Sequence, residues 1–131
     1  MGNSLKIKRI AILVGGLSDE FDISIRTGKQ VEEILEKKYI TKTIKVISDL
    51  NKLLTDLSSF KPDLVFNALH GNFGEDGQVQ SLLNILKISY THSGVASSSI
   101  GMDKFLSKLI FKQKGILCPL GIKTTIKELK N

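Results

Sequence analysis

The densest group of side chains able to do chemistry lies in residues 70–80, HGNFGEDGQVQ. His70, Glu75 and Asp76 stand among three glycines there, directly after an apolar run over residues 64–69. An apolar run that ends in a glycine-rich loop predicts a buried strand delivering polar groups to the carboxyl edge of a sheet. Ligands bind at that edge in open α/β sheets. The alternative is a mobile, solvated surface loop without a site.

A second carboxylate, Glu20, follows another apolar run and the Gly15-Gly16 pair. We predict that it lies in the first turn of a helix at the same sheet edge, where it either binds an ammonium group or only complements the helix dipole. His70 ends a strand at that edge, so both side chains could face one crevice, although a histidine there is also a common structural hydrogen-bonding group. The loop lacks the glycine patterns of a dinucleotide fingerprint and of a phosphate loop.

The other polar residues give weaker signals. Two histidines and one cysteine without close spacing make a poor case for zinc, so we assign no metal ligands. His92 is expected in a turn, and the serines at 97–99 are expected to form a cap or a turn. Cys118 lacks a basic neighbour in sequence, so we do not expect a nucleophile there. Lys104, taken alone, is an ordinary surface lysine.

The composition bounds the class of protein. A length of 131 residues suits one domain. The net charge is +6, but aromatic residues make up only 6% of the chain and tryptophan is absent, so we do not expect nucleic acid as a partner. The apolar runs are too short to span a membrane, and the N-terminus has no signal-peptide pattern. A single cysteine suits a reducing compartment, so we expect a cytoplasmic protein.

Strand-like and helical patterns alternate along the chain. Strands are predicted over residues 6–14, 40–47, 63–69 and 88–90, and helices over residues 49–57, 77–86 and 103–114. Another helix follows the first strand, with Ser18 or Asp19 as its cap and an apolar face made of Ile23, Thr27, Val31, Ile34 and Leu35. This alternation predicts the α/β class, with a three-layer Rossmann-like domain and a mainly parallel sheet of about four strands.

The C-terminal part is expected to differ from the rest. Residues 1–118 are predicted to form the domain, and Pro119 marks a break after it. Residues 122–124 are strand-like, and residues 125–128 fit a capping box at the start of a helix. We interpret residues 119–131 as a linker and the start of a further domain, although a ragged tail would look similar.

Taken together, these segments resemble the N-terminal domain of the D-alanine–D-alanine ligases. Residues 70–81, HGNFGEDGQVQS, fit the first signature of that family throughout. Three further segments support the resemblance, in the family's order and at about its spacing. They are residues 14–20 (VGGLSDE), residues 90–95 (YTHSGV, apart from His92) and residues 99–104 (SIGMDK). The resemblance covers essentially the whole chain.

This resemblance implies an enzyme that joins two D-alanines at the expense of ATP, through an acyl phosphate, to supply peptidoglycan and the cell wall. It implies that Glu20 and His70 are the catalytic pair: Glu20 holds the ammonium group of the first D-alanine, and His70 lies beside its carboxylate. Ile23 would pack on the substrate methyl, and Lys104 would reach the phosphates of the nucleotide. A homodimer formed through this domain is also implied.

The chain departs from the family in several respects. His92 stands where glycine is frequent, and Leu17 and Phe21 make the mouth of the site more apolar. Glu75 and Asp76 are expected to hold the loop. The ATP-grasp lobes, which would bind most of the ATP and the Mg²⁺, have no counterpart here, so this chain alone is predicted to be inactive. The alternatives are a naturally short binding or dimerisation module and a generic ligand-binding domain.

Overall fold

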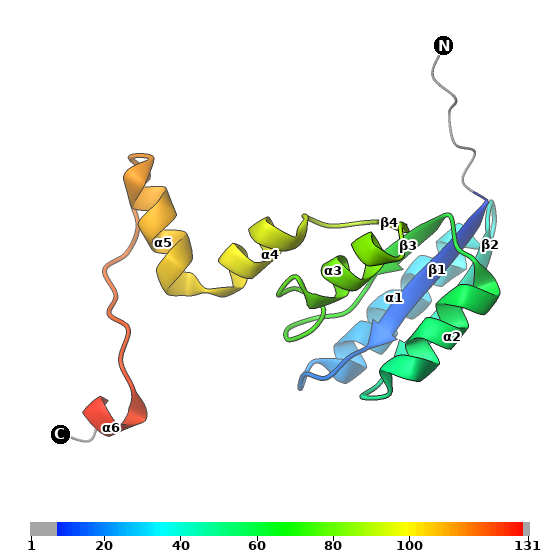
Figure 1. Ribbon diagram of the computed structural model, residues 1–131, viewed down its shortest axis with the longest axis horizontal. Helices are drawn as coiled ribbons and strands as arrows, with labels where there is room; N and C mark the ends of the chain where they lie inside the picture. Colours follow the sequence, from blue (N-terminus) through cyan, green and yellow to red (C-terminus); the bar gives the residue numbers. More distant parts are fainter. Residues whose placement is uncertain (1–7, 130–131) are drawn as a thin grey trace, which may run out of the picture.

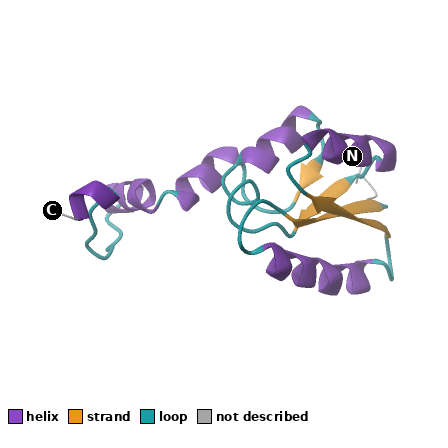
Figure 2. Cartoon of the chain, turned by 90° about the horizontal axis from the view of Figure 1, so that it is seen from below, coloured by secondary structure: helices purple, strands orange, loops and turns teal. Residues whose placement is uncertain are grey.

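The computed structural model describes residues 8–129, in which four parallel strands form one sheet between layers of helices (Figure 1, Figure 2). The strands are β1 (Arg9–Gly15), β2 (Ile40–Val46), β3 (Leu64–Asn67) and β4 (Ser89–Tyr90), in the order β2-β1-β3-β4. The predicted α/β class with a parallel sheet is therefore confirmed. Residues 6 and 7 of the first predicted strand lie outside the described residues.

Helices follow each strand. They are α1 (Phe21–Leu35), α2 (Leu50–Phe60), α3 (Gln78–Ile85), α4 (Val95–Met102), α5 (Lys104–Gln113) and α6 (Ile126–Leu129). The helix α1 covers one face of the sheet, and α2 and α3 cover the other, whereas α4, α5 and α6 extend away from the sheet (Figure 1). The chain therefore consists of a three-layer body and a C-terminal arm, residues 95–129.

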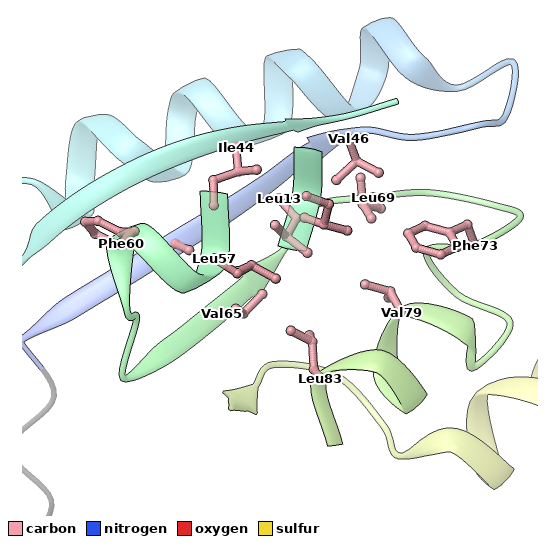
Figure 3. Packing of buried hydrophobic residues seen from close by; sticks show 12 residues of the cluster. Leu13, Ile44, Val46, Leu57, Phe60, Val65, Leu69, Phe73, Val79 and Leu83 are labelled. Carbon is pink, nitrogen blue, oxygen red and sulfur yellow. The ribbon is translucent and has the colours of Figure 1, made fainter. Parts of the chain in front are cut away.

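The core has two parts, one on each face of the sheet. The larger part joins the sheet to α2 and α3, with Leu13, Val65, Leu57 and Leu83 at its centre (Figure 3). The smaller part places Ile10, Ile12 and Val14 of β1 against α1. The strand β1 is buried on both faces, which explains why it is a continuous apolar run without polar alternation.

The packing of α1 on β1 is unusually close. Gly28 is buried, and a Cβ added there would overlap Cγ1 of Val14. Ser24, the other buried residue of α1, lies one turn earlier. The predicted apolar face is therefore partly wrong, because Ile23 and Ile34 are 46% and 67% exposed. Ile25, Val31 and Leu35 pack against the core on this face, while the two fully buried residues of α1 are small ones that an apolar periodicity does not detect.

Three other predictions of local structure are corrected. Neither Ser18 nor Asp19 is the cap of α1: Glu20 takes that position, and the Ser18 hydroxyl donates to the carbonyl oxygen of His70. The serines at 97–99 are not a cap or a turn, because they lie inside α4. Residues 122–124, predicted to be strand-like, pair with no strand in the described part of the chain. The predicted capping box of Thr125 and Glu128 is present at the start of α6.

The C-terminal arm exposes apolar side chains. Leu117, Leu120 and Ile122 are 99%, 93% and 87% exposed, and Ser107 is the buried residue of α5. Within residues 8–129, no helix has the length and apolar character needed to cross a membrane. Exposed apolar side chains gathered in one segment indicate a surface that packs against another part of a protein.

The close approach of α1 to β1 predicts that Gly28→Ala lowers the free energy of unfolding by about 1–3 kcal/mol, because the added methyl overpacks the core. The matched control is Gly101→Ala in α4, where an added Cβ meets nothing within 4 Å. That variant is expected to be neutral or more stable by roughly 0.5–1 kcal/mol. Urea unfolding followed by circular dichroism measures both, and equal effects would contradict the close packing.

Candidate functional site

The loops after β1 and β3 leave the same edge of the sheet. Because β2 lies on one side of β1 and β3 on the other, the strand order reverses between β1 and β3, and crevices in α/β sheets form at such points. A cavity of about 500 Å³ lies there. We call it the switch-point crevice, and it is lined by Leu17, Ser18, Asp19, Glu20, Gly71 and Asn72.

Ser18 joins the two predicted site residues. Its hydroxyl accepts a hydrogen bond from the backbone N–H of Glu20 at 3.3 Å and donates one to the carbonyl oxygen of His70 at 2.9 Å. The side chain of Glu20 closes over the second loop, because a Cβ added at Gly71 would lie 3.0 Å from its Oε2. The backbones of Glu20 and His70 are therefore joined through Ser18, and Glu20 lines the crevice, whereas His70 is not among the residues that line it.

Ser24 fixes the strand ends below this crevice. Its buried hydroxyl accepts from the N–H of Gly15 at 2.8 Å and donates to the carbonyl oxygen of Ala68 at 2.7 Å. Its own N–H donates to the carbonyl oxygen of Glu20 at 3.0 Å. One side chain thus ties the end of β1, the end of β3 and the start of α1 into one unit. Sequence reasoning missed this role of Ser24.

His70 has a free hydrogen-bonding atom. Its Nε2 is buried and has no hydrogen-bond partner in the described part of the chain. The residue is half-buried, and its carbonyl oxygen is held by Ser18. A buried polar atom without a partner is uncommon in native structures. His70 follows β3 directly before Gly71, which lines the crevice, but His70 itself is not part of that lining.

Two acids hold the loop after β3, as expected from the sequence. Glu75 Oε2 accepts from the N–H of Gly71 at 2.7 Å, and Asp76 accepts from the N–H groups of Phe73 and Gln78 at 2.9 and 3.0 Å. Burial raises the pKa of Asp76, but these hydrogen bonds outweigh it and leave the pKa below its ordinary value. The Asp76 carboxylate is therefore a structural group of this loop.

Two buried amides support the same loop from below. The carbonyl oxygen of Gly74 accepts from Asn67 Nδ2 at 2.8 Å and from Gln80 Nε2 at 2.9 Å. Asn67 Oδ1 also accepts from the N–H of Leu69, whereas Gln80 Oε1 is buried without a partner among residues 8–129. Neither residue has a role predicted from the sequence. For Asn67, its position as a polar residue inside an apolar strand pattern could have indicated one.

Lys104 lies in a different cavity. This second cavity of about 320 Å³ lies between α3, α4 and the loop after β4, and it is lined by Glu75, Gln80, His92, Ser93, Ser97, Ser98, Gly101, Met102 and Lys104. Asp103, next to Lys104, caps α5 by accepting from the N–H of Leu106, and this bond lowers its pKa. Glu75 connects the two cavities, because it lines the second and binds Gly71 of the first.

The remaining candidates stay apart from the crevice. Ile23 is on α1 and does not line the cavity. Cys118 is a free cysteine on the C-terminal arm, remote in sequence from both cavities. Within residues 8–129, no three histidine, cysteine or acidic side chains gather in a way that would hold a metal ion.

Comparisons with known proteins point to one family. Residues 45–93 match the family model described as D-ala D-ala ligase N-terminus. A D-alanine–D-alanine ligase from Pelagibacter ubique is 51% identical over 125 residues, which cover 94% of this chain and 40% of the relative. One from Acidiphilium cryptum is 46% identical over 111 residues, covering 84% of this chain and 36% of the relative. This chain therefore spans about 40% of the length of such relatives.

A solved structure gives the same answer in three dimensions. The crystal structure of the D-alanine–D-alanine ligase from Bacillus anthracis complexed with ATP has a TM-score of 0.80 and 35% sequence identity to this chain. The similarity covers 95% of this chain and 43% of that one. The fold of this chain therefore occurs in a ligase whose crystal structure contains ATP.

The bridging role of Ser24 predicts that Ser24→Ala lowers the free energy of unfolding by at least about 2 kcal/mol, because the N–H of Gly15 and the carbonyl of Ala68 lose a buried partner. Ser59→Ala is the matched control, since that exposed hydroxyl only bonds the carbonyl of Thr55 in its own helix. Denaturant unfolding compares the two. A Ser24→Ala protein as stable as the control would contradict the bridge.

The lowered pKa of Asp76 predicts a pH-dependent contribution to stability. The folded state binds this proton less tightly than the unfolded state, so the carboxylate stabilises the fold above its ordinary pKa of 3.8, and the contribution is lost as the pH falls through the lower folded value. The difference in unfolding free energy between the unaltered chain and Asp76→Asn should therefore be largest at neutral pH and shrink in acid. A difference that stays constant across this range would contradict the assignment.

Proposed function

Because this chain belongs to the D-alanine–D-alanine ligase family, we propose that it is the substrate-side domain of an enzyme that joins two D-alanines with ATP. ATP would phosphorylate the carboxylate of the first D-alanine, and the amine of the second would attack the acyl phosphate and release phosphate. The dipeptide would supply peptidoglycan for the cell wall. The switch-point crevice, where Ser18 joins Glu20 to His70, is the observation that carries this proposal.

The carboxylate of Glu20 is the group that would bind the ammonium of the first D-alanine. It lines the crevice, is exposed, and makes no ion pair within residues 8–129. A charge-assisted hydrogen bond between an ammonium and a carboxylate is stronger than a neutral one. The position of Oε2 beside the backbone of Gly71 would hold the amine against the second loop of the crevice.

The imidazole of His70 would lie beside the carboxylate of the same substrate. Support comes from the buried Nε2, which has no hydrogen-bond partner among the described residues, and from the position of His70 next to Gly71 of the crevice lining. Ile23 would contact the substrate methyl. Its side chain is 46% exposed and does not line the crevice. The proposed contact therefore rests on the resemblance of this segment to the ligase family.

The ammonium of Lys104 would contact the phosphates of ATP. It lines the second cavity, which the loop bearing Glu75 separates from the crevice, so the two ligand groups would lie on either side of one loop. The described residues do not fit a magnesium ion, since they offer no cluster of carboxylates. We therefore assign no Mg²⁺ ligand to this chain and derive no step from that ion.

The division of the chain follows from these roles. We propose that residues 1–118 form the substrate-side domain and that residues 119–131 connect it to ATP-grasp lobes. The crevice is formed only by the loops after β1 and β3, on one side of the proposed reacting centre. Stabilisation of a phosphoryl-transfer transition state needs charged groups on all sides of that centre. The 131-residue chain alone would then be inactive as a ligase. A single cysteine favours a cytoplasmic location.

A second candidate function is a binding or dimerisation module. The exposed apolar residues of the C-terminal arm favour it, because Leu117, Leu120 and Ile122 leave a surface that a partner would normally cover. A homodimer formed through this domain is one such partner, and the remaining lobes of a ligase are another. This function is compatible with the first, since the crevice is lined by residues 17–20, 71 and 72, whereas α5 and α6 of the arm extend away from the sheet (Figure 1).

In a full-length ligase that carries this domain, Glu20→Gln is expected to raise the KM for the first D-alanine by roughly 10- to 100-fold, because a hydrogen bond to a charged group is worth about 1.5–3 kcal/mol. Asp22→Asn is the matched control: it removes a negative charge from the first turn of α1, but the residue does not line the crevice. Coupled detection of ADP release, at varied D-alanine, measures both variants.

Two outcomes of that assay would contradict the proposal. One is an unchanged KM in Glu20→Gln, which would remove the carboxylate from the substrate site. The other is ATP-dependent dipeptide formation by the 131-residue chain alone, which would show that a single wall of the site is sufficient. Loss of activity in both Glu20→Gln and Asp22→Asn would indicate a general effect of charge at the start of α1.

A further inference from the structure

The backbone of His92 has a conformation that few side chains adopt. Its φ is +84°, in the left-handed region, where residues other than glycine are uncommon and histidine is one of the better tolerated. The residue is exposed, so its ring is not held there by packing in the core. Backbone strain of this kind gathers at ligand sites, where the surrounding structure maintains it. The position therefore points to a role for the ring itself.

A short hydrogen-bond chain orients the ring. The N–H of Asn67, at the end of β3, donates to Thr91 Oγ1 at 3.0 Å, and Thr91 Oγ1 lies 3.2 Å from Nδ1 of His92. Because Thr91 Oγ1 already accepts from the N–H of Asn67, its own hydroxyl hydrogen is placed to donate to Nδ1 of His92. The neutral ring then carries its proton on Nε2 and presents an N–H donor.

The second cavity gathers further donors around this ring. Lys104 contributes an ammonium, and Ser97 and Ser98 contribute hydroxyls, all lining the same cavity as His92. Glu75 and the buried Gln80 oxygen, which has no partner in the described residues, add acceptors to the same cavity. Because the charges of Lys104 and Glu75 offset each other, the net charge of the cavity contributes little to the affinity for an anion. That affinity would depend on hydrogen bonds from the donor groups that line the cavity. A phosphate group offers several oxygens to these donors.

We propose that His92 and Lys104 form a phosphate-binding pair in the second cavity, with His92 Nε2–H as the neutral donor and Lys104 as the cation. This inference rests on the proposed role of Lys104 toward the phosphates of ATP and adds His92 as a residue that sets the affinity for them. Thr91 is the positioning residue, since it acts only by fixing the tautomer of the ring.

The first test is the tautomer. The chain has two histidines, so long-range ¹H–¹⁵N spectra of the imidazoles distinguish His92 from His70 once His92→Asn has assigned the signals. At about pH 8.5, the neutral ring of His92 is expected to carry its proton on Nε2. Thr91→Ser, which retains the hydroxyl, should keep that tautomer. Protonation of His92 on Nδ1 would overturn the proposal.

The second test is a titration with sodium tripolyphosphate, followed by the same spectra at constant ionic strength. His92→Asn and His92→Gly both tolerate the left-handed backbone, and each is expected to weaken binding by about fivefold or more through loss of the donor. Lys104→Gln should weaken it at least as much. Lys112→Gln, on the same helix but outside the cavity lining, is the matched control and should change binding less than twofold.

The outcomes separate this inference from the proposed function. If Lys104→Gln weakens tripolyphosphate binding and the His92 variants do not, the role of His92 is overturned, and the phosphate role of Lys104 stands. If the unaltered chain shows no binding at millimolar tripolyphosphate, or if Lys112→Gln weakens it as much as Lys104→Gln, the phosphate-binding pair is overturned as a whole. The role of Glu20 in binding D-alanine is unaffected by either result.

Discussion

The buried hydroxyl of Ser24 is the interaction on which the rest of the site depends. It connects the N–H of Gly15 to the carbonyl oxygen of Ala68, and so joins the carboxyl ends of β1 and β3 through α1. The same helix can approach the sheet because Gly28 leaves no side chain in its way. Since Glu20 precedes α1 and His70 follows β3, the relative position of these two groups is set by this contact.

Next to this contact, the loop after β3 is anchored in the core by Leu69 and Phe73, and polar groups hold its backbone. Glu75 and Asp76 bond its backbone from within, and the amides of Asn67 and Gln80 meet at the carbonyl oxygen of Gly74. A hydrogen-bonded loop of this kind presents backbone and side-chain donors at fixed positions. It also forms the wall between two cavities, so a ligand group on one side is placed relative to a ligand group on the other.

The C-terminal arm is not stabilised by a buried core in the way the three-layer body is. Its helices bury little, and its apolar side chains face outward, so its conformation is not determined by the core of the three-layer body. In relatives that are about two and a half times as long as this chain, there is more protein available to cover such a surface. The body is thus stabilised by helices that cover both faces of its sheet, whereas the apolar side chains of the arm remain uncovered.

The sequence by itself determined the α/β class, the parallel sheet and the segments that carry Glu20 and His70, because apolar runs and helical periodicity record burial directly. It also indicated the loop roles of Glu75 and Asp76. Only the tertiary structure decided that Ser24 and Gly28, and not Ile23 and Ile34, face the sheet, and that Lys104 lies in a separate cavity with His92. These features depend on close approach and on hydrogen bonds between residues distant in sequence, which no local pattern of hydrophobicity encodes.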